Sequence, residues 1–171
     1  FDLEHRSLFY GFKGEGKYYG ADYDSGVVNS HHRGDLQEYL LCRTPILADV
    51  FINMPKLKTH KKTGVTLSLK NLVGINADKN WLPHHTEGSP QKGGDEFPDM
   101  PAKRKLERVS VKVARRVAFH VPGLGPRLAQ RMRKAGTAVF GDGRHVIRSG
   151  NWYGNDTTWR MVLDLNRCLL Y

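Results

Sequence analysis

The chain has 171 residues, of which 39% are hydrophobic, two cysteines and a formal net charge of +10 at pH 7. This length suits one domain over residues 1–171, and because the sequence starts at Phe1 without a methionine, we expect a fragment of a longer protein. The composition excludes a membrane-spanning helix, which needs about 18 consecutive apolar residues. It also excludes a disulfide framework or an iron–sulfur cluster, because Cys42 and Cys168 are too few, and we expect a reduced, cytoplasmic chain.

The positive charge is concentrated in one segment, residues 101–135. Eleven basic residues and a single acid, Glu107, give this segment a net charge of +10, so the rest of the chain is neutral in sum. The basic residues are Lys103, Arg104, Lys105, Arg108, Lys112, Arg115, Arg116, Arg127, Arg131, Arg133 and Lys134. The charge is therefore a local property of this segment and not of the whole fold.

The first part of the chain contains one strong strand signal. Residues 1–34 are rich in glycine, tyrosine and charge without a regular period, which favours loops and short strands. Residues 35–42 fit either a short helix or a strand. The apolar residues 50–52 (Val-Phe-Ile) favour β structure, and Pro55 would end the pairing by removing a backbone donor. We therefore predict a buried strand at residues 48–53.

A loop and a helix are expected directly after this strand. Residues 56–64 are dominated by lysine and read as a loop. Apolar residues then recur at helical spacing, which predicts a helix at about 64–74 that Gly74 could end. Residues 76–98 have the composition of a loop, and so long an irregular run inside a compact domain is usually functional or disordered.

The last part of the chain is predicted to be helical. An apolar stripe with basic residues around it predicts a helix at about 101–120, and a shorter helix follows at about 126–135, closed by Gly136. Together they form a basic helical hairpin over residues 101–135. A final helix is predicted at 156–171. These elements indicate an α/β fold, with a small mixed sheet, flanking helices and the hairpin as an insertion.

The lysine-rich stretch at residues 54–96 is the candidate site. Polar residues that follow a buried strand form the ligand sites of many α/β proteins, and converging ammonium groups attract phosphate or carboxylate. Alternation places Lys56, Lys58 and His60 on one side of an extended backbone. Further along lie Lys70 and Lys79. The alternative explanation is a solvated basic loop.

The polar loop at residues 84–96 carries groups that could move protons or bind a metal. Its histidines and acids, with an upstream histidine, could act as a general base and its partner. The same groups and Glu87 could serve a divalent metal, although their spacing matches no metal signature. Alternatively, they bond to the backbone of their own loop. The candidate catalytic residues are His60, His84, His85, Asp95 and Glu96.

A third polar cluster lies at residues 150–160. Residues 155–157 (Asn-Asp-Thr) are good helix caps, and a helix start alone would explain them. An aromatic and guanidinium group surrounds them and suits stacking, anion contact or simple core packing. Its members are Trp152, Tyr153, Trp159 and Arg160.

Two blocks of this sequence together resemble the domain-of-unknown-function family 362. The blocks read PKLKTHKKTGVTLSLKNLVGINADKNWLPHHTEGSPQKGGDE and GNWYGNDTTWRMVLDL. The resemblance implies a bacterial or archaeal domain without an assigned activity, sometimes joined to ferredoxin-type iron–sulfur modules. Residues 101–135 lie outside the resemblance. The motif residues carried over are Lys56, Lys58, His60, Lys70, Asn71, Asp78, Lys79, His84, His85, Gly94, Asp95, Glu96, Asn151, Trp152, Asn155, Asp156, Thr157, Trp159 and Arg160.

We therefore expect an uncharacterised domain that binds a small phosphate- or carboxylate-bearing substrate, either as a binding protein or as a metal-assisted enzyme. We also expect the two sequence blocks to meet in space. The candidate ligand-binding residues are Lys56, Lys58, Lys70, Asn71, Asp78, Lys79, Asn155, Asp156 and Arg160.

Two other functions remain open from the sequence. In the first, the basic hairpin docks on an anionic membrane, which would make the protein membrane-peripheral. Nucleic acid is a weaker candidate for the same surface, because Phe119 is the only aromatic residue of the hairpin. In the second, the domain is an accessory partner of a ferredoxin-type electron-transfer protein.

Overall fold

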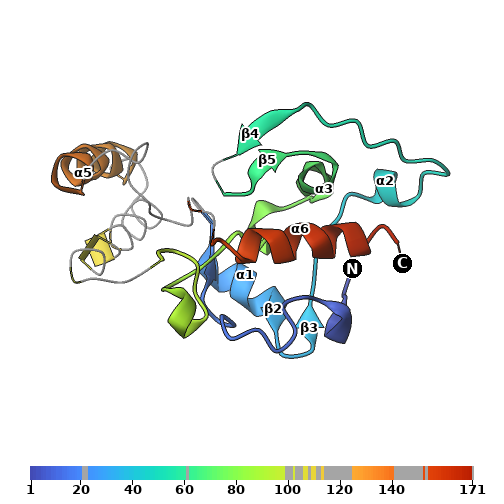
Figure 1. Cartoon of the computed structure of the whole chain (residues 1–171), viewed down its shortest axis with the longest axis horizontal. Helices are drawn as coiled ribbons and strands as arrows, with labels where there is room; N and C mark the ends of the chain where they lie inside the picture. The colour runs from blue at the N-terminus through green and yellow to red at the C-terminus, as the bar shows by residue number, and fades with distance from the viewer. Residues whose placement is uncertain are drawn as a thin grey trace. The chain divides into compact units, whose positions relative to one another are not determined.

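The computed structural model describes residues 1–20, 23–60, 62–98, 125–140 and 154–170, together with Ala102, Leu106, Glu107, Val109, Ser110, Val113 and Trp152. The chain divides into two compact units (Figure 1). The first unit comprises Phe1–Pro98 and Ser149–Tyr171, and the second comprises Asp99–Arg148. The second unit contains the strongly basic segment of the sequence.

The described strands of the first unit form three two-stranded antiparallel sheets. The pairs are β1 (Tyr18–Tyr19) with β6 (His85–Thr86), β2 (His32–Arg33) with β3 (Leu36–Gln37), and β4 (Lys58–His60) with β5 (Gly64–Thr66). The α/β combination of helices and small sheets expected from the sequence is thus confirmed. The segment of residues 35–42, which fitted either a helix or a strand, contributes β3.

Short helices connect these sheets, and one longer helix completes the unit. The α-helices are α1 (Ser25–His31), α2 (Arg43–Ile46), α3 (Ser68–Asn71) and α6 (Thr157–Arg167). The 3-10 helices are η1 (Glu4–Arg6), η2 (Leu72–Ile75), η3 (Lys79–Trp81) and η4 (Pro90–Lys92). Local capping explains two of them, because Asp24 accepts the Gly26 amide at the start of α1 and Asp78 accepts the Asn80 amide at the start of η3.

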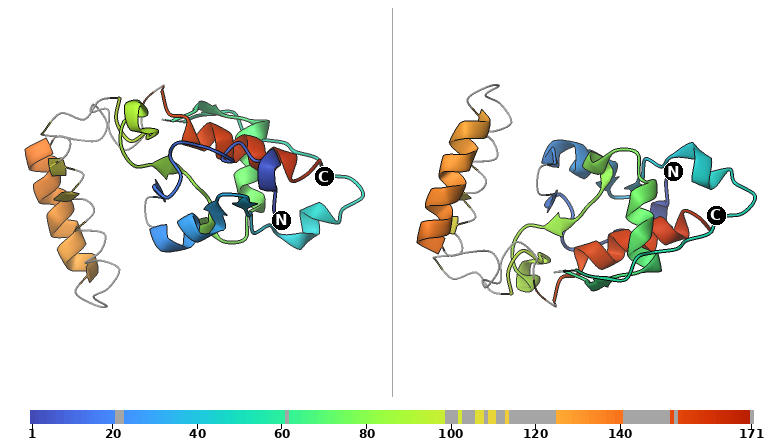
Figure 2. Two further views of the ribbon diagram at one scale, coloured as in Figure 1. Left: turned by 90° about the horizontal axis from the view of Figure 1, so that it is seen from below. Right: turned by 90° about the horizontal axis from the view of Figure 1, so that it is seen from above.

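The core of the first unit is organised around α6. Helix α6 buries Met161, Val162 and Leu165, and Cys168 follows on the same face. Helices α3 and η2 pack against α6, and Figure 2 shows α3 crossing close to it. Several chain segments supply the other core residues: Leu3, Phe9, Tyr18, Val28, Tyr39, Leu72, Ile75 and Leu82. One amphipathic helix thus holds the N-terminal loops and the central loops together.

A buried carboxylate on the same helix ties down the N-terminal segment. Asp164 is fully buried and accepts hydrogen bonds from the Ser7 hydroxyl, the Leu8 amide at 2.9 Å and the Tyr39 hydroxyl at 3.2 Å. Burial raises the pKa of Asp164 from its usual value, and these donors act in the opposite direction. Asp164 therefore links three parts of the chain through one side chain.

The predicted buried strand at residues 48–53 is wrong. Residues 48–57 adopt no regular secondary structure, and the side chains of Val50 and Ile52 are 75% and 72% exposed. High β propensity does not form a strand by itself, because the backbone donors and acceptors need a neighbouring strand. Within the described part of the chain, no strand pairs with this segment.

The predicted helix at 64–74 starts later than expected. Residues 64–66 pair with β4 instead, in the register Lys58↔Thr66, Thr59↔Val65 and His60↔Gly64. Gly64 has φ +73°, a left-handed conformation that glycine adopts without strain. The helical part therefore begins at Ser68 and continues through η2 to Ile75.

The described residues of the second unit are helical. Helix α5 (Gly125–Phe140) is five residues longer than predicted at its C-terminal end, because Gly136 does not interrupt it. The described residues within 101–120 are also helical, whereas the turn between the two predicted helices lies outside the described residues. The final helix is shorter than predicted and ends at Arg167. None of the described helices combines the length and apolar composition that crossing a bilayer requires.

We expect Asp164→Ala to lower the free energy of unfolding by roughly 2–4 kcal/mol, because two buried hydroxyls and one partly buried amide lose their acceptor. The exposed Asp49 provides the control, and Asp49→Ala should change stability by less than about 0.5 kcal/mol. Urea denaturation followed by circular dichroism measures both values. Equal effects of the two substitutions would show that the Asp164 network does not hold the N-terminal segment.

Candidate functional site

Five basic side chains of the first unit act on one another electrostatically, and we call them the basic cluster. Strand β4 supplies Lys58 and His60, the turn after it supplies Lys62, α3 supplies Lys70, and the loop before β6 supplies His84. The charged groups that act on the two histidines are lysines of this cluster and the neighbouring histidine. The β4–β5 hairpin and α3 thus bring basic residues together that are up to 26 positions apart in the sequence.

His60 is held as a neutral ring with a defined tautomer. Its Nδ1 atom accepts the backbone amides of Lys62 at 3.2 Å and Thr63 at 3.3 Å, so the ring proton lies on Nε2. The pKa of His60 is lowered to about 4, mainly by burial and then by the charges of Lys70, Lys62 and Lys58. The Nε2–H group of a neutral ring remains as a hydrogen-bond donor.

His84 is the second neutral histidine of the cluster. Its Nδ1 atom lies 3.0 Å from the Tyr23 hydroxyl, and its backbone carbonyl accepts the Thr158 hydroxyl at 2.8 Å. Burial is the largest cause that lowers the pKa of His84 to about 3, followed by Lys62 and Lys70. His84 is therefore uncharged at neutral pH.

The lysines of the cluster also repel one another electrostatically. Burial lowers the pKa of Lys70, and the charge of Lys58 lowers it further. Like charges that are held together in a partly buried position raise the free energy of the cluster. A negatively charged group placed among them would lower that free energy, because it would interact favourably with every member.

Two aromatic residues border the basic cluster. Tyr19 stacks on the buried ring of His85, with centroids 4.8 Å apart and an interplanar angle of 19°. The Lys62 ammonium group contacts the ring nitrogens of His85. Tyr23 packs edge-on against His84, and the Lys79 ammonium group lies 5.8 Å from the centroid of the Tyr23 ring. The rings of Tyr19 and Tyr23 thus fix the orientation of His85 and His84, respectively.

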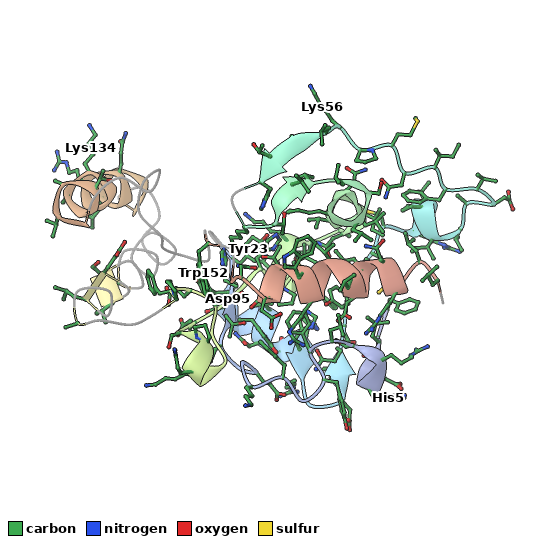
Figure 3. The ribbon with its side chains drawn as sticks, viewed as in Figure 1. His5, Tyr23, Lys56, Asp95, Lys134 and Trp152 are labelled. Atoms are coloured by element: carbon green, nitrogen blue, oxygen red, sulfur yellow. The ribbon has the colours of Figure 1, made fainter. Side chains whose placement is uncertain are left out.

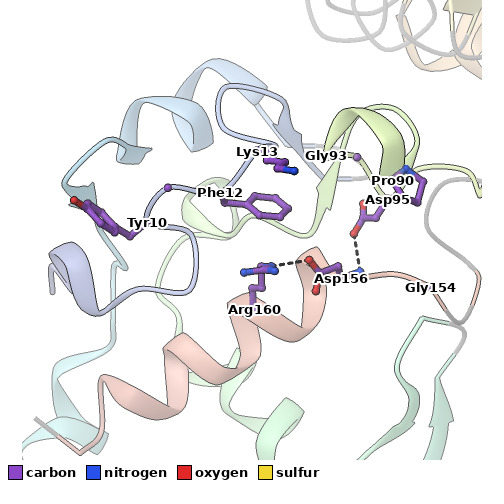
Figure 4. Close-up of a pocket in the computed structure, with 11 residues that line it drawn as sticks. Tyr10, Phe12, Lys13, Pro90, Gly93, Asp95, Gly154, Asp156 and Arg160 are labelled. Atoms are coloured by element: carbon purple, nitrogen blue, oxygen red, sulfur yellow. Dashed lines mark hydrogen bonds and ion pairs between the residues drawn. The ribbon is translucent and has the colours of Figure 1, made fainter.

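A separate cavity of about 370 Å³ lies between the N-terminal loop, the loop after η4 and the start of α6 (Figure 4). Phe12 and Lys13 line one side, and Arg160 lines another. The Arg160 guanidinium group lies 4.5 Å from the centroid of the Phe12 ring and donates to the Leu8 carbonyl at 2.8 Å. At Gly93 (φ +74°), a Cβ atom would lie 2.7 Å from the backbone of Lys13, so the close approach of the two loops requires glycine.

Asp95 joins the two sequence blocks. Its carboxylate accepts the amides of Thr86 at 2.8 Å, Thr157 at 2.8 Å and Asp156 at 3.2 Å. Its backbone carbonyl accepts the Trp152 indole N–H at 2.9 Å, and Figure 3 shows Asp95 and Trp152 close together. The two blocks thus meet in space, as expected from the sequence. Asp95 caps α6 from another loop, a structural role that accounts for its burial.

The other predicted site residues lie outside the basic cluster. Some make local structural contacts: Asn71 donates to Asn53, Asp78 and Asn155 each accept a nearby amide, and Glu96 accepts the Gly88 amide at 3.3 Å. Asp156 pairs with Arg160 at 2.7 Å beside the cavity. Lys56 is exposed, and Figure 3 shows it well separated from Tyr23 and Asp95.

Four residues that belong to the cluster or border the cluster or the cavity are not among the candidates predicted from the sequence. Lys62 was one lysine among several in a loop, and Tyr19, Tyr23 and Phe12 belong to an N-terminal region without a regular period. A local signal was present only for Lys62, which lies two residues after His60. The tyrosines reach the cluster through β1 and the segment before α1, and no sequence spacing reports that contact.

The described residues do not gather three His, Cys, Asp or Glu side chains into a group that could hold a metal ion. The chain belongs to the family described as Domain of unknown function (DUF362), whose model matches residues 11–169. This match confirms the family found in the sequence and covers nearly the whole chain. It also spans residues 101–135, so the expectation that this segment lies outside the resemblance is wrong. No curated protein and no solved structure shows significant similarity to the chain.

We expect Asp95→Ala to lower the free energy of unfolding by roughly 2–4 kcal/mol, because the three amides that it accepts would be left without their acceptor. Asp156→Ala is the matched control, since the Asp156 side chain is 51% exposed and its loss should cost less than about 1 kcal/mol. Chemical denaturation of both variants checks this. An Asp95→Ala variant as stable as the wild type would contradict the capping role.

We expect the free protein to lose stability as the pH falls from about 6.5, the ordinary pKa of histidine, toward 4 and 3, the lowered values of His60 and His84. In that window the unfolded chain binds more protons than the folded chain, so acid favours unfolding. His84→Asn should make the loss smaller, whereas substitution of His5, whose side chain is 71% exposed, should not. Denaturation curves at several pH values provide the test, and equal slopes for His84→Asn and wild type would refute it.

Proposed function

We propose that this domain binds a phosphate- or carboxylate-bearing small molecule at the basic cluster. The observation that carries the proposal is that His60 and His84 are neutral partly because lysines surround them. A cluster of like charges has an unfavourable electrostatic energy in the free protein. Bound anions remove that cost, and sites that perturb the pKa of several groups at once are typical of function.

The cluster supplies the donors that such an anion requires. Lys58, Lys62 and Lys70 offer ammonium groups, and the neutral ring of His60 offers its Nε2–H group. Hydrogen bonds between a charged donor and a charged acceptor are each worth about 1.5–3 kcal/mol. The loss of one lysine is therefore expected to weaken anion binding roughly ten- to a hundredfold.

His84 and Tyr23 form a pair that suits proton transfer to or from the bound molecule. The Tyr23 hydroxyl lies 3.0 Å from the His84 Nδ1 atom, which orients the ring. A neutral histidine next to an anion site could act as a general base, with the anion raising its pKa toward the working pH. In this form of the proposal the domain is an enzyme, and a divalent metal could accompany the substrate.

The test uses inorganic sulfate and phosphate as probes and measures the shift in melting temperature and the Kd by calorimetry. Ligands that bind only the folded state stabilise it by an amount that grows with the logarithm of the ligand concentration once that concentration exceeds the Kd. We expect Lys62→Gln and Lys70→Gln to weaken binding of the probes about ten- to a hundredfold. Lys56→Gln is the matched control, because Lys56 is exposed and is not among the lysines whose charge lowers the pKa of His60 or His84. Addition of magnesium in a parallel series tests the metal-assisted form.

The pH dependence of sulfate binding gives a second readout. Sulfate keeps its charge near neutral pH, and its binding should raise the pKa values of His60 and His84. Protonation then accompanies binding, so the Kd for sulfate should decrease as the pH falls toward about 4 and 3, the pKa values of the two histidines in the free protein. If Lys56→Gln and Lys62→Gln weaken sulfate binding equally, or if neither probe binds the wild type, the basic cluster is not an anion site.

A further inference from the structure

Helix α5 carries a large positive charge and no acidic residue. Its 16 residues, Gly125–Phe140, include Arg127, Arg131, Arg133 and Lys134. The described side chains of Arg131 and Lys134 are exposed, and Figure 3 labels Lys134 on the outside of the helix. Charges of one sign on one helix repel one another, so this surface favours an anionic partner.

The same helix exposes an apolar stripe. Leu128, Ala135 and Val139 are spaced by seven and four residues, which places them on one face of an α-helix. Leu128 is 39% exposed and Val139 is 65% exposed. Exposed apolar residues in register on a helix that is otherwise basic are the pattern of a helix that lies in a membrane interface.

We propose that α5 binds the surface of membranes that contain anionic lipids. The helix would lie in the plane of the interface, with Leu128 and Val139 inserted at the boundary of headgroups and acyl chains. Arg131 and Lys134 would contact the lipid phosphates and carboxylates. This interaction involves the second unit alone and does not depend on ligand binding at the basic cluster.

A lipid surface accounts for both the basic residues and the apolar stripe of this helix, whereas a nucleic acid accounts only for the basic residues. The phosphate backbone of a nucleic acid would use the four basic residues, but it offers nothing apolar to Leu128 and Val139. Binding to single strands usually relies on aromatic side chains that stack on bases. The sequence of α5 contains one aromatic residue, Phe140, at its last position.

The experiment is co-sedimentation of the full chain with phosphatidylcholine vesicles, prepared with and without phosphatidylserine. We expect binding only to vesicles that contain phosphatidylserine, with affinity that falls as salt increases. The double variant Arg131→Gln/Lys134→Gln should bind about tenfold more weakly, because each basic residue near an anionic surface contributes to binding. These exposed positions allow substitution without disturbing the folded protein.

A matched pair of variants distinguishes the contribution of apolar insertion to vesicle binding from the contribution of charge. Leu128→Glu and Gln130→Glu add the same negative charge to the same helix, but Gln130 lies on the opposite face from Leu128. We expect Leu128→Glu to weaken vesicle binding at least about tenfold more than Gln130→Glu, because a charge cannot enter the apolar boundary.

Two results would overturn the proposal. The first is equal loss of vesicle binding in Leu128→Glu and Gln130→Glu, which would show that only charge matters. The second is wild-type retention on double-stranded DNA without binding to anionic vesicles, which would assign the helix to nucleic acid. Circular dichroism of each variant verifies that the helical content is retained, and loss of binding with full helical content supports the proposal.

Discussion

The carboxylate of Asp95 is the contact on which the arrangement of the first unit depends. It accepts amides from β6 and from the start of α6, across a sequence separation of 62 residues for Thr157. The contact orients α6, the helix around which the core packs, and it fixes the loop that carries Gly93 and lines the cavity. A hydrogen bond between the hydroxyls of Thr86 and Thr157 at 2.7 Å strengthens the same junction. A carboxylate that resembled a catalytic group in the sequence is therefore a cap in the structure.

The basic cluster has the opposite energetic character. Asp95 and Asp164 each gather donors around one negative charge, whereas Lys58, Lys62 and Lys70 gather positive charges around neutral histidines. The first arrangement stabilises the fold, and the second lowers the stability of the free protein. Natural proteins keep such unfavourable local arrangements mainly at sites that bind or react, which is why the cluster, and not the cap, supports the proposed function.

Local sequence signals suffice for some elements of this fold and fail for others. The final helix was predicted from its apolar face and its polar start, because an amphipathic helix needs only one surface to pack on. The strand at 48–53 was predicted from the same kind of local evidence and is wrong, because a strand needs a partner that local sequence cannot supply. The start of the helix at 64–74 was misplaced for a related reason: residues 64–66 pair with β4.

The sequence by itself determined the location of the excess charge, the α/β class and the family. These properties depend on composition and on residue order, which are visible along the chain. Only the tertiary structure decided that Asp95 caps α6, that Lys56 is not among the lysines that act on His60 and His84, and that Tyr23 contacts His84. The role of a polar side chain depends on which donors and charges surround it. Those neighbours come from distant segments that only the packed core brings together.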